Sequence, residues 1–171
     1  MIDFETKKVL FIDLDSTLIK TISGKTFPED ITDFRIQLPV LDKIIEKIPN
    51  LTYFFIVTNQ GGIGKFTTED DFQTKLFCIE RFCDMYFRDR TKIYYCSDSD
   101  YCASLDKDCH ARKPNTGMLE ELANDYGIRS KKECIMIGDA SGKPGDFSDS
   151  DKKCAENFDI DYIDVRDFLE L

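Results

Sequence analysis

The stretch VLFIDLDSTL, residues 9–18, decides the fold of this 171-residue chain. Four apolar residues, typical of a buried strand, run directly into Asp13 and Asp15, and a threonine follows at the same spacing. A strand that ends in Asp-x-Asp-x-Thr aims two carboxylates and a hydroxyl at one point, which suits a divalent cation and a phosphoryl group. An EF-hand calcium loop also begins with alternating acids, but it needs a glycine at position six and a glutamate at position twelve. Leu18 and Gly24 stand there, so the sequence excludes an EF-hand.

Strand-like and helix-like segments alternate along the chain. The apolar spacing predicts strands at Lys8–Asp13, Thr52–Thr58, Lys92–Cys96, Glu133–Gly138 and Asp161–Ile163, and helices at Pro39–Pro49, Thr68–Arg88, Asn115–Tyr126 and Asp151–Phe158. The second strand, TYFFIVT, is nearly all apolar, as expected for a parallel strand covered on both faces. The pattern predicts one α/β domain over residues 1–171, with a mostly parallel sheet flanked by helices.

The bulk composition limits the partners and the compartment. Acidic residues outnumber basic ones, 33 to 23, and the net charge of −10 argues against a general, salt-driven affinity for nucleic acid. It does not exclude an enzyme that holds one end of a strand. No apolar run reaches the length of a membrane span, so no membrane partner is expected. The acidic start and the odd set of seven cysteines predict a cytoplasmic or nuclear, non-secreted protein with reduced thiols.

Polar residues gather where the expected strands end. The first strand ends at Asp13, the second at Thr58-Asn59 and the fourth at Gly138-Asp139, while Arg112-Lys113-Pro114 precedes a helix. Ligands of parallel α/β sheets bind at the carboxyl ends of the strands. Each segment alone is an ordinary turn, cap or loop, but all four in this order indicate a site for phosphoryl transfer.

This order of motifs resembles the haloacid dehalogenase superfamily of aspartate-nucleophile phosphatases. Finer matches resemble the phosphatase domain of polynucleotide kinase 3′-phosphatases and cover nearly the whole chain. They are SGKTFP at 23–28, DFRI at 33–36, TNQGGIGK at 58–65, RKPNTGM at 112–118 and GDASGKPGDFSDSDKKCAEN at 138–157. A long insertion separates Asp139 from Asp151, as in the DNA-end phosphatases. The resemblance implies a Rossmann-like haloacid dehalogenase fold with a minimal or absent cap domain.

The resemblance also implies a mechanism and a cofactor. Asp13 would be the nucleophile that forms an aspartyl-phosphate, and Asp15 would be the general acid and then the general base. Thr58 and Lys113 would hold phosphate oxygens and complete the catalytic set. Mg²⁺ is the implied ion, because it prefers hard oxygen ligands. Its implied ligands are the Asp13 side chain, the Asp15 backbone carbonyl and the Asp139 side chain, with Asp151 in support.

The implied substrate is the 3′-phosphate end of DNA or RNA, in nucleic-acid end repair. The residues expected to bind phosphate or substrate are Thr58, Asn59, Lys65, Arg112 and Lys113. For Lys65 and Arg112, ordinary surface charge is the alternative. Three departures from the family pattern leave the fine preference open: Phe34 replaces a tryptophan, and Phe66 and Ser16 replace glycines. The P-loop pattern Gly-x-x-x-x-Gly-Lys-Ser/Thr does not occur in the sequence, and the most similar segment, GDASGKP at 138–144, has the wrong spacing. The chain is therefore expected to lack the kinase half of many relatives.

The segment before Arg112 suggests a second metal. Related bacterial phosphatases of histidinol phosphate and heptose bisphosphate carry a zinc loop here. A zinc set in this chain would consist of Cys96, Cys102, Cys109 and His110. Asp98 and Ala111 stand where ligands would be expected, and this spacing favours free thiols over zinc. The alternative functions are a small-molecule phosphatase of the histidinol-phosphate or heptose-bisphosphate type and a catalytically silent module that binds strand ends.

Overall fold

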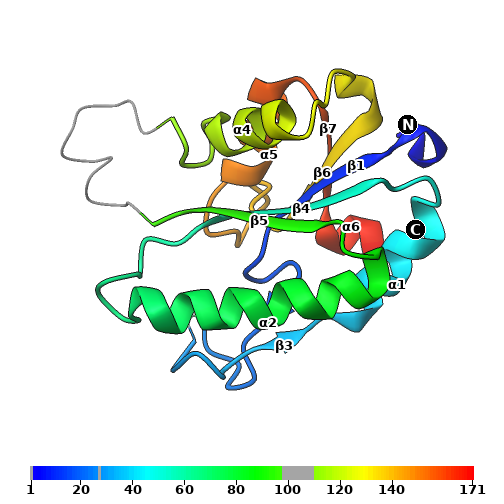
Figure 1. Cartoon of the computed structure of the whole chain (residues 1–171). Coiled ribbons are helices and arrows are strands. Elements are labelled where there is room, and N and C mark those ends of the chain that lie inside the picture. The colour runs from blue at the N-terminus through cyan, green and yellow to red at the C-terminus, as the bar shows by residue number, and fades with distance from the viewer. Residues whose placement is uncertain (1, 27, 98–109) are drawn as a thin grey trace.

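Five strands among the described residues form one parallel sheet. The computed structural model describes residues 2–26, 28–97 and 110–171. The strands lie in the order β5-β4-β1-β6-β7, and each neighbouring pair is parallel (Figure 1). Their bounds are β1 Val9–Ile12, β4 Tyr53–Asn59, β5 Thr91–Cys96, β6 Cys134–Gly138 and β7 Asp161–Asp164. The predicted parallel sheet is confirmed.

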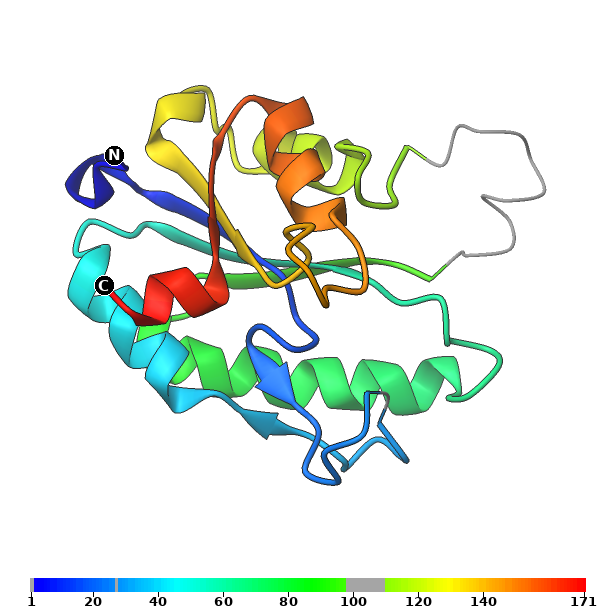
Figure 2. The same ribbon diagram turned by 180° about the vertical axis from the view of Figure 1, so that it is seen from behind.

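Helices cover both faces of this sheet, as Figures 1 and 2 show. One face carries α1 Leu38–Lys47, α2 Glu69–Phe87 and α6 Val165–Leu169; the other carries α4 Gly117–Asp125 and α5 Ser150–Phe158. Strand β1 contributes side chains to the hydrophobic core on both faces of the sheet, because successive side chains of a strand point to opposite faces. Leu10 and Ile12 pack into the core under α1 and α2, while Val9 and Phe11 pack under α4 and α5. A continuous apolar strand is therefore what a central position in this sheet requires.

The longest helix, α2, begins where the sequence predicts. The Thr68 hydroxyl accepts a hydrogen bond from the Asp71 backbone N–H at 3.1 Å, and acids fill the first turn. The buried stripe of this helix includes Phe72, Leu76 and Ile79. The predicted helices differ from the observed ones by at most a few residues at their ends.

Several short elements escaped the sequence analysis. Strand β2 Ile19–Lys20 pairs antiparallel with β3 Arg35–Ile36, and two single 3₁₀ turns span Phe4–Thr6 and Lys131–Glu133. Two-residue strands are too short to show a period, and α6 follows β7 without a break. Between β1 and α1 the described chain holds only β2, β3 and their connections, which agrees with a minimal cap.

The sheet order places a topological switch point at β1. Strands β4 and β5 lie on one side of β1, and β6 and β7 lie on the other; α2, which follows β4, covers one face of the sheet, and α5, which follows β6, covers the opposite face. Ligands of parallel α/β sheets bind at the carboxyl ends of the strands at such a point, which is where Asp13 follows Ile12. None of the described helices is long and apolar enough to cross a membrane.

Candidate active site

Asp13 lies in a buried ion-pair cluster at the carboxyl end of β1. The Lys113 ammonium is 2.6 Å from Asp13 Oδ1 and 2.7 Å from Asp151 Oδ1, and it donates to the Val57 carbonyl at 2.8 Å. These contacts use all three donors of the ammonium. Lys113, Asp13 and Asp151 are only 3%, 7% and 1% exposed. The cluster is thus a buried cation held between two buried acids; we call it the Lys113 network.

A third acid, Asp139, completes the acidic wall of this site. Asp13, Asp139 and Asp151 each offer a carboxylate oxygen, and these oxygens all lie within 4.8 Å of one another. The Thr17 hydroxyl donates to Asp139 Oδ1 at 3.4 Å. Burial first, and the neighbouring Asp151 in addition, raise the pKa of Asp13 well above its usual range and raise the pKa of Asp139 to about 6.

The charges of this cluster suit a divalent cation. Burial alone would lower the pKa of Lys113, but Asp13 and Asp151 raise it, so the side chain stays charged. It contributes one positive charge to a wall of three acids, and burial makes the ionised acids unfavourable without a further cation. Converging carboxylate oxygens are the hard ligands that Mg²⁺ prefers. Asp13, Asp139 and Asp151 therefore fit the implied ion.

Glycine at position 138 brings Asp151 into the cluster. A Cβ atom at Gly138 would lie 2.3 Å from Asp151 Oδ2, which is closer than real contacts allow. Asp151 Oδ2 also accepts from the Ala140 backbone N–H at 3.1 Å. The Gly-Asp pair of the sequence thus has two roles: Asp139 supplies a carboxylate, and Gly138 leaves room for the carboxylate from α5.

Asn59 holds the loop that carries Lys113. Its amide nitrogen donates to the Lys113 carbonyl at 2.9 Å, and its amide oxygen accepts from the Lys113 N–H at 3.0 Å. This reciprocal pair joins the end of β4 to the loop before α4, where the Lys113–Pro114 peptide bond is cis. The sequence analysis expected Asn59 to contact substrate, and in the structure both polar groups of its side chain bind the protein backbone.

Asp15 lies at the mouth of the site, with a side chain that is 46% exposed. The Gln60 amide nitrogen donates to Asp15 Oδ2 at 2.5 Å and to the Thr58 hydroxyl at 2.9 Å. Lys75 of α2 lies 3.9 Å from Asp15 Oδ1 and 5.3 Å from the centre of the Phe34 ring. Burial lowers the pKa of Lys75, and the charge of Asp15 opposes this effect.

Comparison with known proteins agrees with this geometry. Residues 8–168 match the family described as "Polynucleotide kinase 3 phosphatase". The chain belongs to this family. The "Bifunctional polynucleotide phosphatase/kinase" of Schizosaccharomyces pombe is 33% identical over 168 residues, which cover 96% of this chain and 38% of that protein. The chain thus spans well under half of that relative.

A further relative and two solved structures are also similar to the chain. The "Probable D-glycero-D-manno-heptose-1,7-bisphosphate 7-phosphatase" of Thermoplasma volcanium is 29% identical over 150 residues, which cover 82% of this chain and 91% of that protein. A crystal structure titled as the D,D-heptose 1,7-bisphosphate phosphatase from B. bronchiseptica, complexed with magnesium and phosphate, has a TM-score of 0.61 at 16% identity. The alignment covers 95% of this chain and 96% of that one. A crystal structure titled as a "putative had-like phosphatase" from Mesorhizobium loti has a TM-score of 0.64 at 19% identity, and the alignment covers 88% of this chain and 68% of that one. The Rossmann-like haloacid dehalogenase fold is thereby confirmed.

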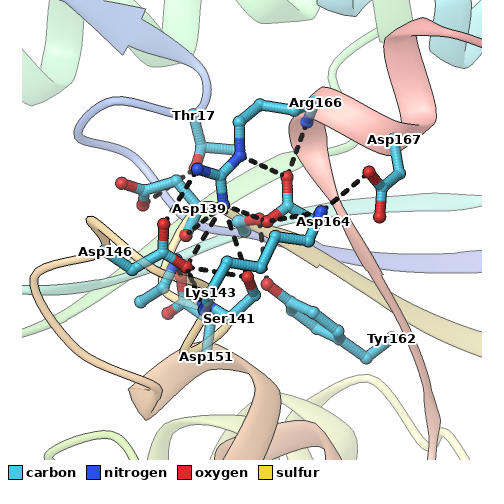
Figure 3. A network of polar contacts seen from close by, with 12 residues as sticks. Thr17, Asp139, Ser141, Lys143, Asp146, Asp151, Tyr162, Asp164, Arg166 and Asp167 are labelled. Atoms are coloured by element: carbon cyan, nitrogen blue, oxygen red, sulfur yellow. Dashed lines mark hydrogen bonds and ion pairs between the residues drawn. The ribbon is translucent and has the colours of Figure 1, made fainter.

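The long insertion between Asp139 and Asp151 is held by a second ion-pair network (Figure 3). Arg166 of α6 lies between Asp146 of the insertion and Asp164 of β7, at 2.8 Å from an oxygen of each. The two acid side chains are only 4% and 2% exposed. Hydrogen bonds of the Asp146 carboxylate to Ser141 and Lys143 fold the insertion back on itself. We call this cluster the Arg166 network.

The Arg166 network adjoins the Lys113 network. Arg166 Nη2 donates to the Asp139 carbonyl at 3.4 Å, so the guanidinium contacts the backbone of an acid in the other cluster. Hydrogen bonds from Arg166 lower the pKa values of Asp146 and Asp164, although burial opposes this. Ion pairs between residues of this chain therefore hold the insertion, and both acids have a cationic partner.

The structure brings together most of the predicted site. Asp13, Thr58, Lys113, Asp139 and Asp151 converge at the carboxyl edge, with Asp15 at its mouth. Lys65 is an exposed residue of the loop after β4. Arg112 is half-buried, and its Nη1 atom has no hydrogen-bond partner among the described residues. These placements leave their roles as substrate contacts a prediction.

The zinc hypothesis concerns residues that are only partly described. Cys96 is buried at the end of β5, whereas the exposed His110 bonds Glu120 Oε2 at 2.8 Å. Cys102 and Cys109 lie outside the described residues, so this hypothesis also stays a prediction.

Gln60, Lys75 and Arg166 were missed by the sequence analysis. The sequence did contain a signal for a functional role of Gln60, because this residue follows Thr58-Asn59 inside the family motif TNQGGIGK. Lys75 had no such signal, since Asp15 lies far before it along the chain. The contacts of Arg166 with Asp139 and Asp146 are likewise distant in sequence.

Proposed function

We propose that the chain is a polynucleotide 3′-phosphatase that removes the 3′-phosphate from DNA or RNA ends, as in nucleic-acid end repair. The observation that carries this proposal is the Lys113 network. A buried, lysine-paired Asp13 beside two further acids is the arrangement that an aspartyl-phosphate mechanism needs, and it lies in a chain matched to the 3′-phosphatase family over residues 8–168.

The mechanism would have two steps. An Asp13 carboxylate oxygen attacks phosphorus, the bond to the 3′ oxygen breaks, and that oxygen takes a proton from Asp15. Water then attacks the phosphorus of the aspartyl-phosphate, Asp15 takes its proton, and the Asp13–phosphorus bond breaks to release phosphate. The partly exposed Asp15 suits the leaving-group side, while the buried Asp13 suits the nucleophile.

Thr58 and Lys113 would bind the transferred phosphoryl group. The Thr58 oxygen accepts from Gln60, which leaves the hydroxyl proton free to donate to a phosphate oxygen. The buried Lys113 ammonium would attract the negatively charged phosphoryl group and could exchange one of its three protein contacts for a phosphate oxygen. When bound by Asp13, Asp139 and Asp151, Mg²⁺ would neutralise charge on the phosphoryl oxygens and favour the ionised nucleophile.

Two exposed aromatic residues support a nucleic-acid substrate. Phe66 is 90% exposed in the loop after β4, and Phe147 is 91% exposed in the insertion after β6. Both loops leave the carboxyl edge of the sheet. Nucleic-acid bases stack on aromatic side chains without regard to sequence. With a net charge of −10, stacking next to the site would supply affinity that a general basic surface does not.

A small-molecule phosphatase is the second candidate. The relative from Thermoplasma volcanium, named as a probable heptose-bisphosphate phosphatase, aligns with 82% of the chain. The open position of Asp15 would admit a small phosphate ester as well as a strand end.

Phosphate release from matched substrates tests the proposal. We would compare a 3′-phosphorylated oligonucleotide, as DNA and as RNA, with histidinol phosphate and heptose 1,7-bisphosphate, each with Mg²⁺ or EDTA. The expected result is preferential, Mg²⁺-dependent turnover of an oligonucleotide. Preferential turnover of a small ester would favour the second candidate, and turnover of none would favour the module that only binds strand ends.

The aromatic residues provide a second test of the substrate class. Phe66→Ala and Phe147→Ala should raise KM for the oligonucleotide and leave turnover of a small alkyl phosphate unchanged. Phe77→Ala is the matched control, because Phe77 is an exposed phenylalanine in the middle of α2. Equal effects on both substrates would contradict a stacking role.

A further inference from the structure

Gln60 links the two side chains that flank the scissile bond in the proposed mechanism. Its amide nitrogen donates to Asp15 Oδ2 at 2.5 Å and to the Thr58 hydroxyl at 2.9 Å. The amide nitrogen faces Asp15, as the ionised carboxylate requires, because an ionised carboxylate can only accept hydrogen bonds. The two protons on this nitrogen match the two acceptors. One side chain therefore fixes both the proposed acid and the proposed phosphate donor.

The backbone of Gln60 is itself held in place. Its N–H donates to the Cys96 carbonyl at 2.7 Å, which continues the pairing of β4 with β5 beyond the end of β4. The amide thus extends from a rigid element rather than from a free loop. Geometry supported in this way is what catalytic groups need, since small misplacements cost large factors in rate.

The hydrogen bond from Gln60 gives the two carboxylate oxygens of Asp15 different surroundings. Oδ2 is held by Gln60, while Oδ1 lies 3.9 Å from Lys75 in a side chain that is 46% exposed. Without the amide, the Asp15 side chain could rotate toward solvent or toward Lys75. With it, Oδ1 is the oxygen left to face a leaving group.

From these contacts we infer that Gln60 is a positioning residue for proton transfer. It holds Asp15 in the orientation from which the carboxyl group gives a proton to the leaving oxygen and later takes one from water. It also orients the Thr58 hydroxyl toward the phosphoryl group. The inference rests on the proposed function, because it assigns Gln60 a role through Asp15.

A pair of substrates that differ in one bridging atom tests the inference. An oligonucleotide 3′-phosphate releases an alcohol, which needs a proton from Asp15, whereas its bridging-sulfur analogue releases a thiolate, which needs none. The variant is Gln60→Met, which keeps the shape and removes both donors. Gln73→Met is the matched control, since the Gln73 amide bonds Glu69 on the surface of α2. Asp15→Asn is the reference for complete loss of the acid.

Single-turnover release of the alcohol or thiol is the measurement. Gln60→Met should slow release of the alcohol by about a hundredfold and release of the thiol by less than about threefold. Phosphorylated Asp13 should accumulate with the sulfur substrate, as seen by mass spectrometry, because water activation is also impaired. Gln73→Met should behave as the unchanged protein does.

Failure of the inference and failure of the proposed function give different results. Suppose that Asp15→Asn slows release of the alcohol more than release of the thiol. If Gln60→Met then slows the two releases by the same factor, or slows neither of them, Gln60 has no positioning role. If Asp15→Asn does not discriminate between the two substrates, the proposed role of Asp15 is wrong. If the unchanged protein hydrolyses no oligonucleotide, the same pair is prepared on the small alkyl phosphate that it hydrolyses, and the criterion for Gln60 is unchanged.

Discussion

The Lys113 and Arg166 networks adjoin at the carboxyl edge of the sheet, and each places one cation between two buried carboxylates. Their electrostatics differ. In the Lys113 network burial raises the pKa values of Asp13 and Asp139, while in the Arg166 network hydrogen bonds lower those of Asp146 and Asp164. With Asp139, the first cluster has three acids to one cation and so an excess of negative charge, whereas both acids of the second cluster are paired with Arg166. The cluster with excess negative charge is the one suited to bind a cation and an anionic substrate, and the paired one is suited to hold a loop.

The largest test of this contrast is Asp13→Asn. We expect phosphate release to fall by about a thousandfold or more, because the amide is a poor nucleophile. Steady-state turnover and thermal unfolding would be measured on the same sample. The matched change in the other network is Asp146→Asn, which should keep turnover within about threefold. Substantial activity in Asp13→Asn with intact folding would exclude Asp13 as the nucleophile.

Lys113→Met should affect both activity and stability. Removal of the ammonium leaves Asp13 and Asp151 buried without their partner, which we expect to cost about 3 kcal/mol of unfolding free energy. Turnover should fall by about a hundredfold, since a charge near the phosphoryl group is lost. Urea unfolding with EDTA and with Mg²⁺ checks the electrostatic cause: Mg²⁺ should stabilise the variant more than the unchanged protein. An equal Mg²⁺ effect on both proteins would argue against a shared site.

Arg166→Met should mainly affect stability. Asp146 and Asp164 would lose their shared partner, but the guanidinium is 51% exposed and water can replace part of its contacts. We expect a loss of about 1–3 kcal/mol in urea unfolding, with turnover within about threefold at saturating Mg²⁺. Lys153→Met is the control, because Lys153 of α5 pairs with the partly exposed Asp149 outside this network and such pairs contribute little. A loss of turnover larger than the loss of stability would show that the two networks are not separable.

The smallest expected effect is a pH dependence with opposite signs in the two networks. Folding raises the pKa of Asp139 from its ordinary value near 4 to about 6, so the folded state binds more protons in this window. Its contribution to stability is therefore present at low pH and lost as pH rises from about 4 to about 6. Asp146 and Asp164, with lowered pKa values, contribute stability above about pH 4 and lose it as pH falls further.

Thermal unfolding in EDTA from about pH 2 to about pH 7 measures this difference. Asp139→Asn should flatten the decline in melting temperature on the side of rising pH, and Mg²⁺ should flatten it in the unchanged protein. Asp146→Asn should instead change only the acidic side of the curve. An effect of Asp139→Asn on the acidic side of the curve, or of Asp146→Asn on the side of rising pH, would contradict the contrast between the networks.

The sheet and the acids were predictable because their signals are local. The apolar run before Asp13, the capped start of α2 and the Gly-Asp pair each lie within a few residues. The helper residues were not predictable in the same way. Arg166 and Lys75 look like ordinary helix residues in the sequence, and only the packing of α6 and α2 near the carboxyl edge gives them their distant partners, Asp146 and Asp15. The two-residue strands β2 and β3 were missed because two residues carry no period.

Asn59 shows a different limit. The sequence located it correctly at the end of β4, but a polar side chain in a phosphate-site motif could face either the ligand or the protein. The structure directs both of its polar groups to the Lys113 backbone. Its expected role changes from a substrate contact to a support of the loop, and nothing within the motif itself could have made that choice.

The bond between Lys113 and Asp13 joins residues 100 positions apart along the chain. Closing so long a segment costs chain entropy before the contact can contribute, so such contacts form late in folding. The helices and the strand pairs of short sequence separation, β1 with β4 and β4 with β5, can reach near-native order while the nucleophile still lacks its lysine. Catalytic competence would then come after most of the helix content of a refolding chain, and recovery of activity would report completion of folding more strictly than recovery of helix content.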